Sequence, residues 1–579
     1  MNLPEFQGPV FNRGDANYQI HAYQYGTSTY DPTVTGDMAP NAIVYLQPGT
    51  ADSDIQLAIA YAVQADVAIA VRTGGHQYSG ASSTSGQNIQ LDISEAFFDF
   101  DLTSRPGYLV AGVSHKLIDF ATLLHQNNMF LPMGECSHVH LGGHAQSGGY
   151  GQMCRSFGLL GDNVVGFEIW TADAGGPQKR TVMRDSTTPA DVDLFFAVLG
   201  GSPGNFGIVT RVILKPLLDA DHPHSRGLKI LAPYNHEALK NLYALMVDFV
   251  QTNESGIDFT VNSTAATTQY LADALGEASY DSYMKYNYPE EYGRDPNDPL
   301  SDLSLMIWPS LIVYVQFSNL GGASEPYNPE FCNKVRAAMA PCGILQLPVQ
   351  NDDAHVPISK LNFQWIYSGV REFDYPYVKN GQVSTQTAFP GWAEFVAGWI
   401  DTIQQQQPNG LMIFSQCQYF GGYNSAMYKN NNGKTAYSWR DATIGINFDM
   451  FYDVETNPNA LALANGFQAQ YTSQAIGPSG IFSKQDLRWY WATHGGRDLS
   501  KVWQYYVSPT TYQRLLQIKK TYDPQSVFSP NAFCVGGAKQ SSKPRAVRLM
   551  REKGAAVDDK VNVAKLRAAA AAGQPRSKL

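Results

Sequence analysis

The sequence predicts an α+β protein that folds into two lobes. The chain has 579 residues, of which 44% are hydrophobic, so it can bury more than one core. Short apolar strands, helical stretches and glycine-dense loops alternate before about residue 210, whereas longer helical patterns and separated strands follow Leu217. This change predicts a first lobe over residues 1–218 and a second lobe over residues 219–500.

The elements of the first lobe follow from the spacing of apolar residues. Short apolar stretches predict strands, and apolar residues at helical spacing predict helices between them. A glycine-rich segment at 141–151 separates the second helix from the strand that follows. The expected strands cover residues 42–46, 67–72, 88–94 and 164–173, and the expected helices cover 52–65 and 114–128.

The second lobe carries separated strands, of which 310–318 (SLIVYVQFS) and 410–420 (GLMIFSQCQYF) are the clearest. Residues 510–522 then place apolar side chains at helical spacing until Asp523 and Pro524 end the pattern. This helix is expected to return to the first lobe, so residues 501–536 are assigned there. Residues 537–579 contain few large apolar side chains and are expected to form a mobile tail.

Charge and composition exclude several classes of function. A formal net charge of -10 disfavours binding to nucleic acid and to anionic membranes. No secretion signal and no apolar run of about 18 residues is present, so neither export nor membrane insertion is expected. The six cysteines form no CxxC pair, so we expect no disulfide framework and no metal site.

The last three residues, Ser577, Lys578 and Leu579, match the tripeptide that addresses proteins to peroxisomes. The tail before them gives a receptor room to reach the tripeptide. A disordered end without this role is the alternative. We therefore expect a peroxisomal location and the peroxisomal import receptor as a partner.

Three glycine-dense loops lie beside strand-like sequence in the first lobe, where backbone amides can approach a ligand such as a phosphate closely. None matches GxxxxGK[ST] or opens a GxGxxG turn, which disfavours an ATP-type loop and the usual nicotinamide site. Tight turns alone would also explain these glycines. His76 and Cys136 lie in two of these regions, and neither residue is decisive by itself.

Four segments in order carry a resemblance to a known family: VRTGGHQYSG, ECSHVHLGGHAQSGGYGQMCRSFGLLGDNVV, GGSPGNFGIVT and YQRLLQIKKTYDPQSVF. Together they resemble the vanillyl-alcohol-oxidase superfamily and, within it, the berberine-bridge-enzyme-like branch, which includes carbohydrate oxidases. The resemblance implies an FAD-binding lobe of the PCMH type. It also implies a substrate lobe built on an antiparallel sheet covered by helices.

The resemblance implies that FAD is held covalently, with His76 bonded to the 8α-methyl carbon and Cys136 bonded to ring carbon C6. Two bonds to the ring would make it a stronger hydride acceptor. Val139 is a small residue three positions after Cys136, which the family associates with oxidases, whereas His138 and His140 are unusual neighbours. The other implied contacts are Arg72, Thr73, Gly74, Gly75 and Ser79 for the pyrophosphate, Gly142, Gly143, Gly148, Gly149 and Tyr150 for the ring or ribityl chain, and Val209 for the adenine side.

Alcohol oxidation needs a base for the hydroxyl proton, and tyrosine is the family's usual base. Tyr490 in WYWATHGGRDLSKVWQYY is the nearest match to that tyrosine, although the customary Asn is missing and His494 is placed to replace or assist it. Gln418 would hydrogen-bond a substrate hydroxyl, and Tyr78 matches a substrate-side tyrosine. Core packing is the alternative for Tyr490, Gln418 and Tyr78.

The implied activity is that of an FAD-dependent oxidase acting on a small-molecule alcohol or carbohydrate, with dioxygen as acceptor and hydrogen peroxide as product. The first alternative is an oxidative cyclase or dehydrogenase acting on a secondary metabolite. A polar, aromatic-lined groove in the second lobe would favour sugars, and a closed apolar pocket would favour the alternative. A flavin-loaded binding or storage protein is a third possibility. The peroxisomal ending fits a product that is peroxide.

Overall fold

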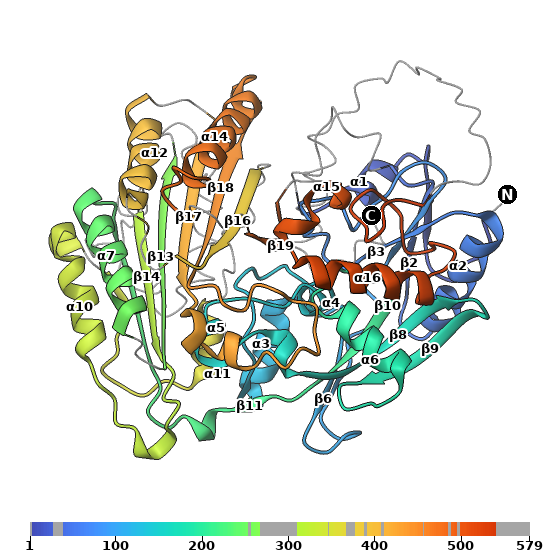
Figure 1. Ribbon diagram of the computed structural model, residues 1–579, viewed down its shortest axis with the longest axis horizontal. Coiled ribbons are helices and arrows are strands. Elements are labelled where there is room, and N and C mark those ends of the chain that lie inside the picture. The colour runs from blue at the N-terminus through green and yellow to red at the C-terminus, as the bar shows by residue number, and fades with distance from the viewer. Residues whose placement is uncertain are drawn as a thin grey trace.

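The structure is a computed structural model in which the described residues form two lobes side by side, an α+β arrangement as expected (Figure 1). The second lobe is an antiparallel sheet with helices on one face, as the resemblance implied. The described residues are 3–26, 39–252, 256–266, 310–345, 347–365, 377–386, 389, 391–406, 410–454, 457–483, 488–494 and 498–539.

The first lobe begins with a small sheet whose central strands are parallel. Both β2 and β3 pair with β4 in parallel register, and β1 adds an antiparallel edge. Helix α2 (Ala51–Ala65) crosses between β2 and β3, and its first turn carries Asp52 and Asp54, which suit the positive end of the helix dipole. The order is β1 (Val10–Asn12), β2 (Ala42–Tyr45), β4 (Ile89–Asp92) and β3 (Ile69–Arg72), and α1 (Tyr18–Ala22) follows β1.

A second, antiparallel sheet completes the first lobe. Its buried side shares one apolar core with the first sheet and the surrounding helices. The strand order is β5 (Phe100–Asp101), β6 (Leu109–Gly112), β10 (Ile208–Leu214), β8 (Val164–Asp173) and β9 (Gly176–Met183). The helices are α3 (Leu117–Gln126), α4 (Leu141–Gln146), α5 (Cys154–Phe157) and α6 (Pro189–Val198), and β7 (Met129–Phe130) pairs with β11 (Leu217–Leu218).

The second lobe is an eight-stranded sheet. Figure 1 shows its helices on the face turned away from the first lobe. The strand order is β15 (Leu347–Gln350), β12 (Arg226–Pro233), β14 (Ser310–Phe317), β13 (Ile257–Ala266), β17 (Leu411–Tyr419), β18 (Ile444–Tyr452), β16 (Tyr377–Ser384) and β19 (Arg488–His494). The helices are α7 (His236–Thr252), α10 (Glu330–Ala338), α12 (Trp392–Gln406) and α14 (Ala460–Ala475), with α11 (Ile358–Trp365) packed on α3.

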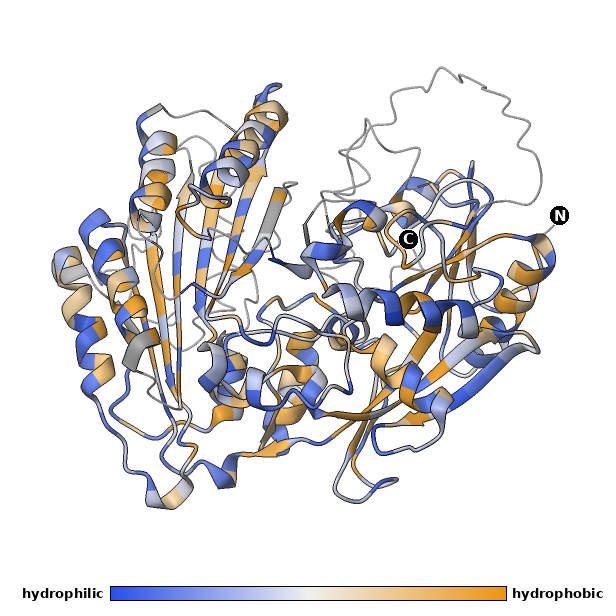
Figure 2. Ribbon diagram, in the orientation of Figure 1, coloured by the Kyte–Doolittle hydropathy of each residue, from blue (hydrophilic) through white to orange (hydrophobic). Residues whose placement is uncertain are grey.

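The two faces of this sheet differ in polarity because successive strand residues point to opposite sides. On β17, Ile413, Cys417 and Tyr419 join the apolar core under the helices. The residues between them, Gln416 and Gln418, point toward the first lobe and are buried there. Figure 2 shows this alternation as orange and blue bands along the strands.

The chain returns to the first lobe through its C-terminal helix, as expected. Helix α16 (Pro509–Tyr522) packs on α6 and β8, Ser508 caps its start, and Asp523 follows its last residue. The remaining short helices are α13 (Ala426–Lys429) and α15 (Leu499–Val502). The lobe boundaries at 218 and 500 stay predictions, and Ser577–Leu579 lie outside the described residues.

A buried ion pair joins the carboxyl ends of the parallel strands. Arg72 and Asp92 are neighbours in register, are fully buried, and form a salt bridge. The Arg72 guanidinium also donates to the Tyr45 hydroxyl at 3.2 Å and to the Tyr23 carbonyl at 2.9 Å. Three strand ends and the N-terminal segment are thus tied to one charged group.

We expect Asp92→Asn to destabilise the protein strongly because it leaves the Arg72 charge buried without its counter-ion. The free energy of unfolding should fall by about 3 kcal/mol or more, measured by denaturant unfolding. The control is Glu330→Gln, which removes an exposed pair with Lys334 and should cost less than about 1 kcal/mol. Equal small losses in both variants would contradict a structural role for the buried pair.

Candidate active site

The loop after β3 carries His76 and is covered by the N-terminal segment. The His76 ring stacks on the Tyr25 ring with centroids 3.9 Å apart and planes at 24°. The Gly26 amide donates to the Gly75 carbonyl at 2.7 Å. Gly75 has a φ of +70°, a conformation that favours glycine. Sequence reasoning missed Tyr25, since no motif connects it with the loop.

Gly74 lets the His76 loop approach the segment that follows Cys136. A Cβ at Gly74 would lie 2.8 Å from Cδ2 of His140 and 3.0 Å from Cδ2 of His76. No side chain fits between the two rings, so only glycine allows this contact. The two predicted attachment regions are therefore side by side. Cys136 has a half-buried, free thiol.

Three histidines around these loops are held in the neutral form. Burial lowers the pKa of His140 to about 3 and the pKa values of His138 and His144 to about 4. The Gly134 amide donates to Nε2 of His144 at 2.8 Å, which a neutral ring can accept. At neutral pH these side chains add hydrogen-bonding groups without adding positive charge.

The glycine-rich segment 141–151 forms a short helix and a tight turn. Gly142 and Gly143 lie within α4, whereas Gly148 and Gly149 have φ values of +97° and +72°. A Cβ at Gly148 would lie 2.6 Å from the ring of Tyr437, a residue that sequence reasoning did not single out. The turn therefore packs against the segment between β17 and β18, and Tyr150 follows it directly.

Tyr490 on β19 stacks on Tyr150, with ring centroids 4.0 Å apart and planes at 14°. A Cβ at Gly445 would meet the Tyr490 hydroxyl, so this glycine makes room for the phenol. Burial raises the pKa of both phenols well above the ordinary value. Both are therefore protonated at neutral pH. Tyr490 lies at the lobe interface, and its role as base stays a prediction.

Polar side chains on the second-lobe sheet reach the loop before Cys136. Gln416 donates to Oε2 of Glu135 at 2.6 Å, and Gln418 donates to Oε1 of the same carboxylate. Asn447 on β18 donates to Oε1 of Gln416 at 3.2 Å. The predicted Gln418 thus lies in the interface, and Glu135 and Asn447 are functional candidates that sequence reasoning missed.

Other predicted residues have their own partners in the first lobe. Arg72 is fully buried and forms a salt bridge with Asp92, and its contact with the pyrophosphate stays a prediction. Ser79 donates to Oε1 of Gln77 at 3.2 Å. Val209 is buried in β10, where it pairs with Ile169. Tyr78 is buried as well.

The remaining predicted residues are placed as follows. The Thr73 side chain faces α4. Its Oγ1 would lie 3.9 Å from a Cβ added at Gly143. Val139 packs on the first-lobe core. The backbone of His494 pairs with Asn380, but the His494 side chain lies outside the described part of the chain.

Several buried polar atoms near the two attachment loops have no hydrogen-bond partner within the described part of the chain. They are Oγ of Ser137, Nδ1 of His140 and both amide atoms of Gln152. Buried polar groups are normally satisfied, so such a cluster indicates a polar ligand. These residues fit a flat cofactor with hydrogen-bonding edges, such as the flavin that the resemblance implies.

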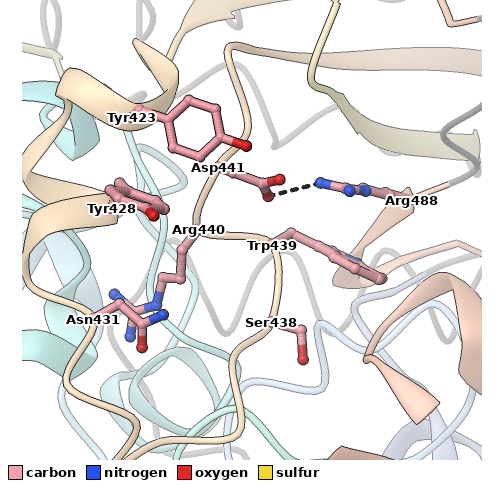
Figure 3. A pocket seen from close by; sticks show the side chains of 8 residues that line it. All are labelled: Tyr423, Tyr428, Asn431, Ser438, Trp439, Arg440, Asp441 and Arg488. Carbon is pink, nitrogen blue, oxygen red and sulfur yellow. Dashed lines mark hydrogen bonds and ion pairs between the residues drawn. The ribbon is translucent and has the colours of Figure 1, made fainter. Parts of the chain in front are cut away.

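A surface pocket of about 290 Å³ lies on the segment between β17 and β18 and on the start of β19 (Figure 3). The rings of Tyr423 and Tyr428 meet edge to face at 4.8 Å. The Arg488 guanidinium lies 4.5 Å over the Trp439 ring and also pairs with Asp441 at 2.8 Å. Exposed aromatic rings beside charged groups are suited to sugar binding.

Among the described residues, no cluster of three His, Cys, Asp or Glu side chains could hold a metal ion. No helix in the described ranges is long and apolar enough to cross a membrane.

Comparisons with known proteins show which family and which solved structures this chain is similar to. Residues 42–175 match the FAD binding domain family. Berberine bridge enzyme-like 25 of Arabidopsis thaliana is 26% identical over 432 residues, which cover 69% of this chain and 74% of the relative. The structure of Physcomitrella patens BBE-like 1 superposes with a TM-score of 0.62 and 17% identity, covering 93% of this chain and 97% of that protein.

A second similar structure is that of glucooligosaccharide oxidase from Acremonium strictum, a protein described with a 6-S-cysteinyl, 8α-N1-histidyl FAD. It has a TM-score of 0.62 and 18% identity, and the match covers 91% of this chain and 97% of that protein. At this identity the structural likeness establishes a shared fold.

Proposed function

Because this chain belongs to the berberine-bridge-enzyme-like branch of FAD-linked oxidoreductases, we propose that it oxidises a hydroxyl group of a sugar or another polyol. The electrons pass to dioxygen, and hydrogen peroxide is released. Small Val139 after Cys136 supports dioxygen as the acceptor. The predicted peroxisomal address at Ser577–Leu579 would place peroxide in a suitable compartment, and this location remains a proposal.

The polar face of the second-lobe sheet is the observation that carries this proposal. Oε1 of Gln418, Oδ1 of Asn447 and Oγ1 of Thr260 are buried and have no hydrogen-bond partner among the described residues. Thr260 lies directly opposite Gln418 in the sheet. Hydroxyl groups of a polyol could donate to these oxygens. An apolar polycyclic substrate would leave each unsatisfied, at a cost of about 1–3 kcal/mol per group.

The aromatic pocket next to β19 supports the same substrate class. Tyr423, Tyr428 and Trp439 provide ring faces or edges, and Asp441 and Arg488 provide hydrogen-bonding groups. Arg488 lies two residues before Tyr490 on the same strand. This combination favours a sugar over the terpenoid or alkaloid of the alternative, an oxidative cyclase or dehydrogenase.

We propose that His76 and Cys136 hold FAD covalently at two positions, as in the named glucooligosaccharide oxidase. When bound, FAD supplies the hydride acceptor. The loops of His76 and Cys136 are in contact, and the buried polar atoms of Ser137, His140 and Gln152 are available to its ring. The stacked Tyr150 and Tyr490 would close the site against water and orient the substrate.

The function is tested by mixing the purified protein anaerobically with monosaccharides, oligosaccharides, polyols and apolar aromatic alcohols while the flavin absorbance is recorded. We expect sugars or polyols to bleach the flavin and readmitted oxygen to yield one peroxide per bleaching event. Bleaching by apolar alcohols alone would favour the secondary-metabolite alternative. Failure of every alcohol would favour a flavin-binding or storage protein.

Covalent attachment is tested by acid precipitation and intact mass. We expect His76→Ala and Cys136→Ala each to keep yellow colour in the pellet through the remaining bond, and the double variant to release it. Cys342→Ala removes a thiol that is half-buried like Cys136 and should retain both bonds. Yellow supernatant from either single variant would count against two bonds.

Asn447→Leu should weaken binding of a sugar or polyol because it removes a buried hydrogen-bonding oxygen. We expect KM to rise about tenfold, which corresponds to one lost hydrogen bond of about 1.4 kcal/mol. The control is Thr264→Val on β13, which is separated from β18 by β17; Thr264 already bonds Ser310 at 3.0 Å. An unchanged KM in Asn447→Leu would remove Asn447 from the substrate site.

A further inference from the structure

The carboxylate of Glu135 lies where the two lobes meet, one residue before Cys136. Both of its oxygens accept hydrogen bonds from the second-lobe sheet, Oε2 from Gln416 at 2.6 Å and Oε1 from Gln418. Asn447 continues the chain of bonds by donating to Gln416. A first-lobe carboxylate is therefore oriented by neutral amides of the other lobe.

These donors preserve the negative charge of Glu135. Carboxamide N–H groups stabilise an ionised carboxylate by hydrogen bonding but do not neutralise it. The Glu135 charge also acts on the phenol of Tyr150. Burial is the main cause of the raised pKa of Tyr150, and the electrostatic effects of Cys136, Tyr437, Asp449 and Glu135 raise it further. The carboxylate thus acts electrostatically on the same interface that holds the Tyr150 and Tyr490 stack.

Three side chains at this interface, Gln418, Tyr150 and Tyr490, are poor proton acceptors. Gln418 occupies the strand position facing the site, but a carboxamide has no basicity at neutral pH. Tyr150 and Tyr490 are protonated phenols, as described above. An ionised carboxylate can take up a proton as well as accept hydrogen bonds, whereas a carboxamide does not become protonated at neutral pH. At neutral pH the Glu135 carboxylate is therefore a stronger base than the neutral amide of Gln418 or the protonated phenols of Tyr150 and Tyr490.

The chain position of Glu135 would also bring it close to the reacting end of a bound flavin. If Cys136 bonds ring carbon C6, its sulfur is attached one ring atom away from the carbon that carries N5, the hydride acceptor. Cys136 would then hold the residue before it close to the bound flavin. The glutamine bonds turn its side chain toward the sheet that carries the unsatisfied substrate-side oxygens.

We propose that Glu135 is the catalytic base of this enzyme, an inference that rests on the proposed alcohol oxidation. The substrate O–H bond breaks and its proton passes to the Glu135 carboxylate. The adjacent C–H bond breaks with its electron pair, which reduces FAD as hydride, and the carbon–oxygen double bond forms. Dioxygen would then receive two electrons and one proton from the reduced cofactor and a second proton from Glu135, and leave as hydrogen peroxide.

The test compares Glu135→Gln with the wild-type holoenzyme in anaerobic flavin reduction by the best sugar or polyol from the panel. We expect the reduction rate constant to fall at least about a hundredfold, as is typical when a general base is removed. The wild-type rate should decline toward acid as the carboxylate is protonated, and this decline should vanish in the variant. Glu168→Gln, at an ion pair with Arg211 in the first-lobe sheet, is the matched control with wild-type rate and pH profile.

A carboxylate exchange separates the chemistry from folding. The double variant Glu135→Gln with Gln418→Glu keeps one carboxylate and one amide in the pair but moves the charge to the strand. We expect it to recover at least tenfold over Glu135→Gln, with the acid decline restored. Retained colour in the acid pellet and an unchanged melting temperature show that each variant is folded and flavinylated.

A second readout needs no substrate. Removing a negative charge near the ring makes electron uptake easier, so the flavin reduction potential should be higher in Glu135→Gln than in the wild type and unchanged in Glu168→Gln. An equal potential would overturn the placement of Glu135 beside the flavin. A wild-type reduction rate and pH profile in Glu135→Gln would overturn its role as base and leave the proposed oxidation intact.

If no alcohol reduces the wild-type flavin, the proposed function fails, and with it the role of Glu135 as base. In that case the flavin reduction potential of Glu135→Gln still tests whether Glu135 lies beside the flavin.

Discussion

The buried pair of Arg72 and Asp92 is the interaction on which the first lobe's site depends. A guanidinium with no exposure to water needs a counter-ion and further acceptors, and the ends of parallel strands β2, β3 and β4 converge to supply them. The Tyr23 carbonyl completes the set and draws the N-terminal segment across the sheet edge. Tyr25 then covers His76, so a single buried charge organises the loop that follows β3.

The lobes meet through polar groups as well as through apolar packing. Besides the bonds to Glu135, the amide of Ser156 in α5 donates to Asp258 on β13 at 3.1 Å, and burial raises the pKa of Asp258 to about 6. Directional bonds of this kind fix the relative orientation of two surfaces more tightly than apolar contact does. They also leave amide and hydroxyl oxygens facing inward. These oxygens favour a substrate that can donate hydrogen bonds to them.

The spacing of apolar residues was sufficient to predict the helices and strands whose apolar pattern is regular. Helix α2, strand β14 and helix α16 lie within one residue or a few of their predicted ranges. The glycine-rich segment was harder, because α4 forms at a place where glycine disfavours a helix. There the backbone is held by packing, since a Cβ at Gly142 would lie 2.8 Å from Val113. A single sequence does not contain that contact.

The sequence by itself predicted the two-lobed class and the glycine-dense loops, because these depend on residue order and local spacing, and its resemblance to a known family added the paired candidates His76 and Cys136. Only the tertiary structure decided that Arg72 turns inward and that Tyr150 stacks on Tyr490. It alone placed Glu135 opposite Gln416 and Gln418, which lie more than 280 residues away in the chain. Such partners meet through the pairing of strands and the docking of two lobes, and no local pattern records either.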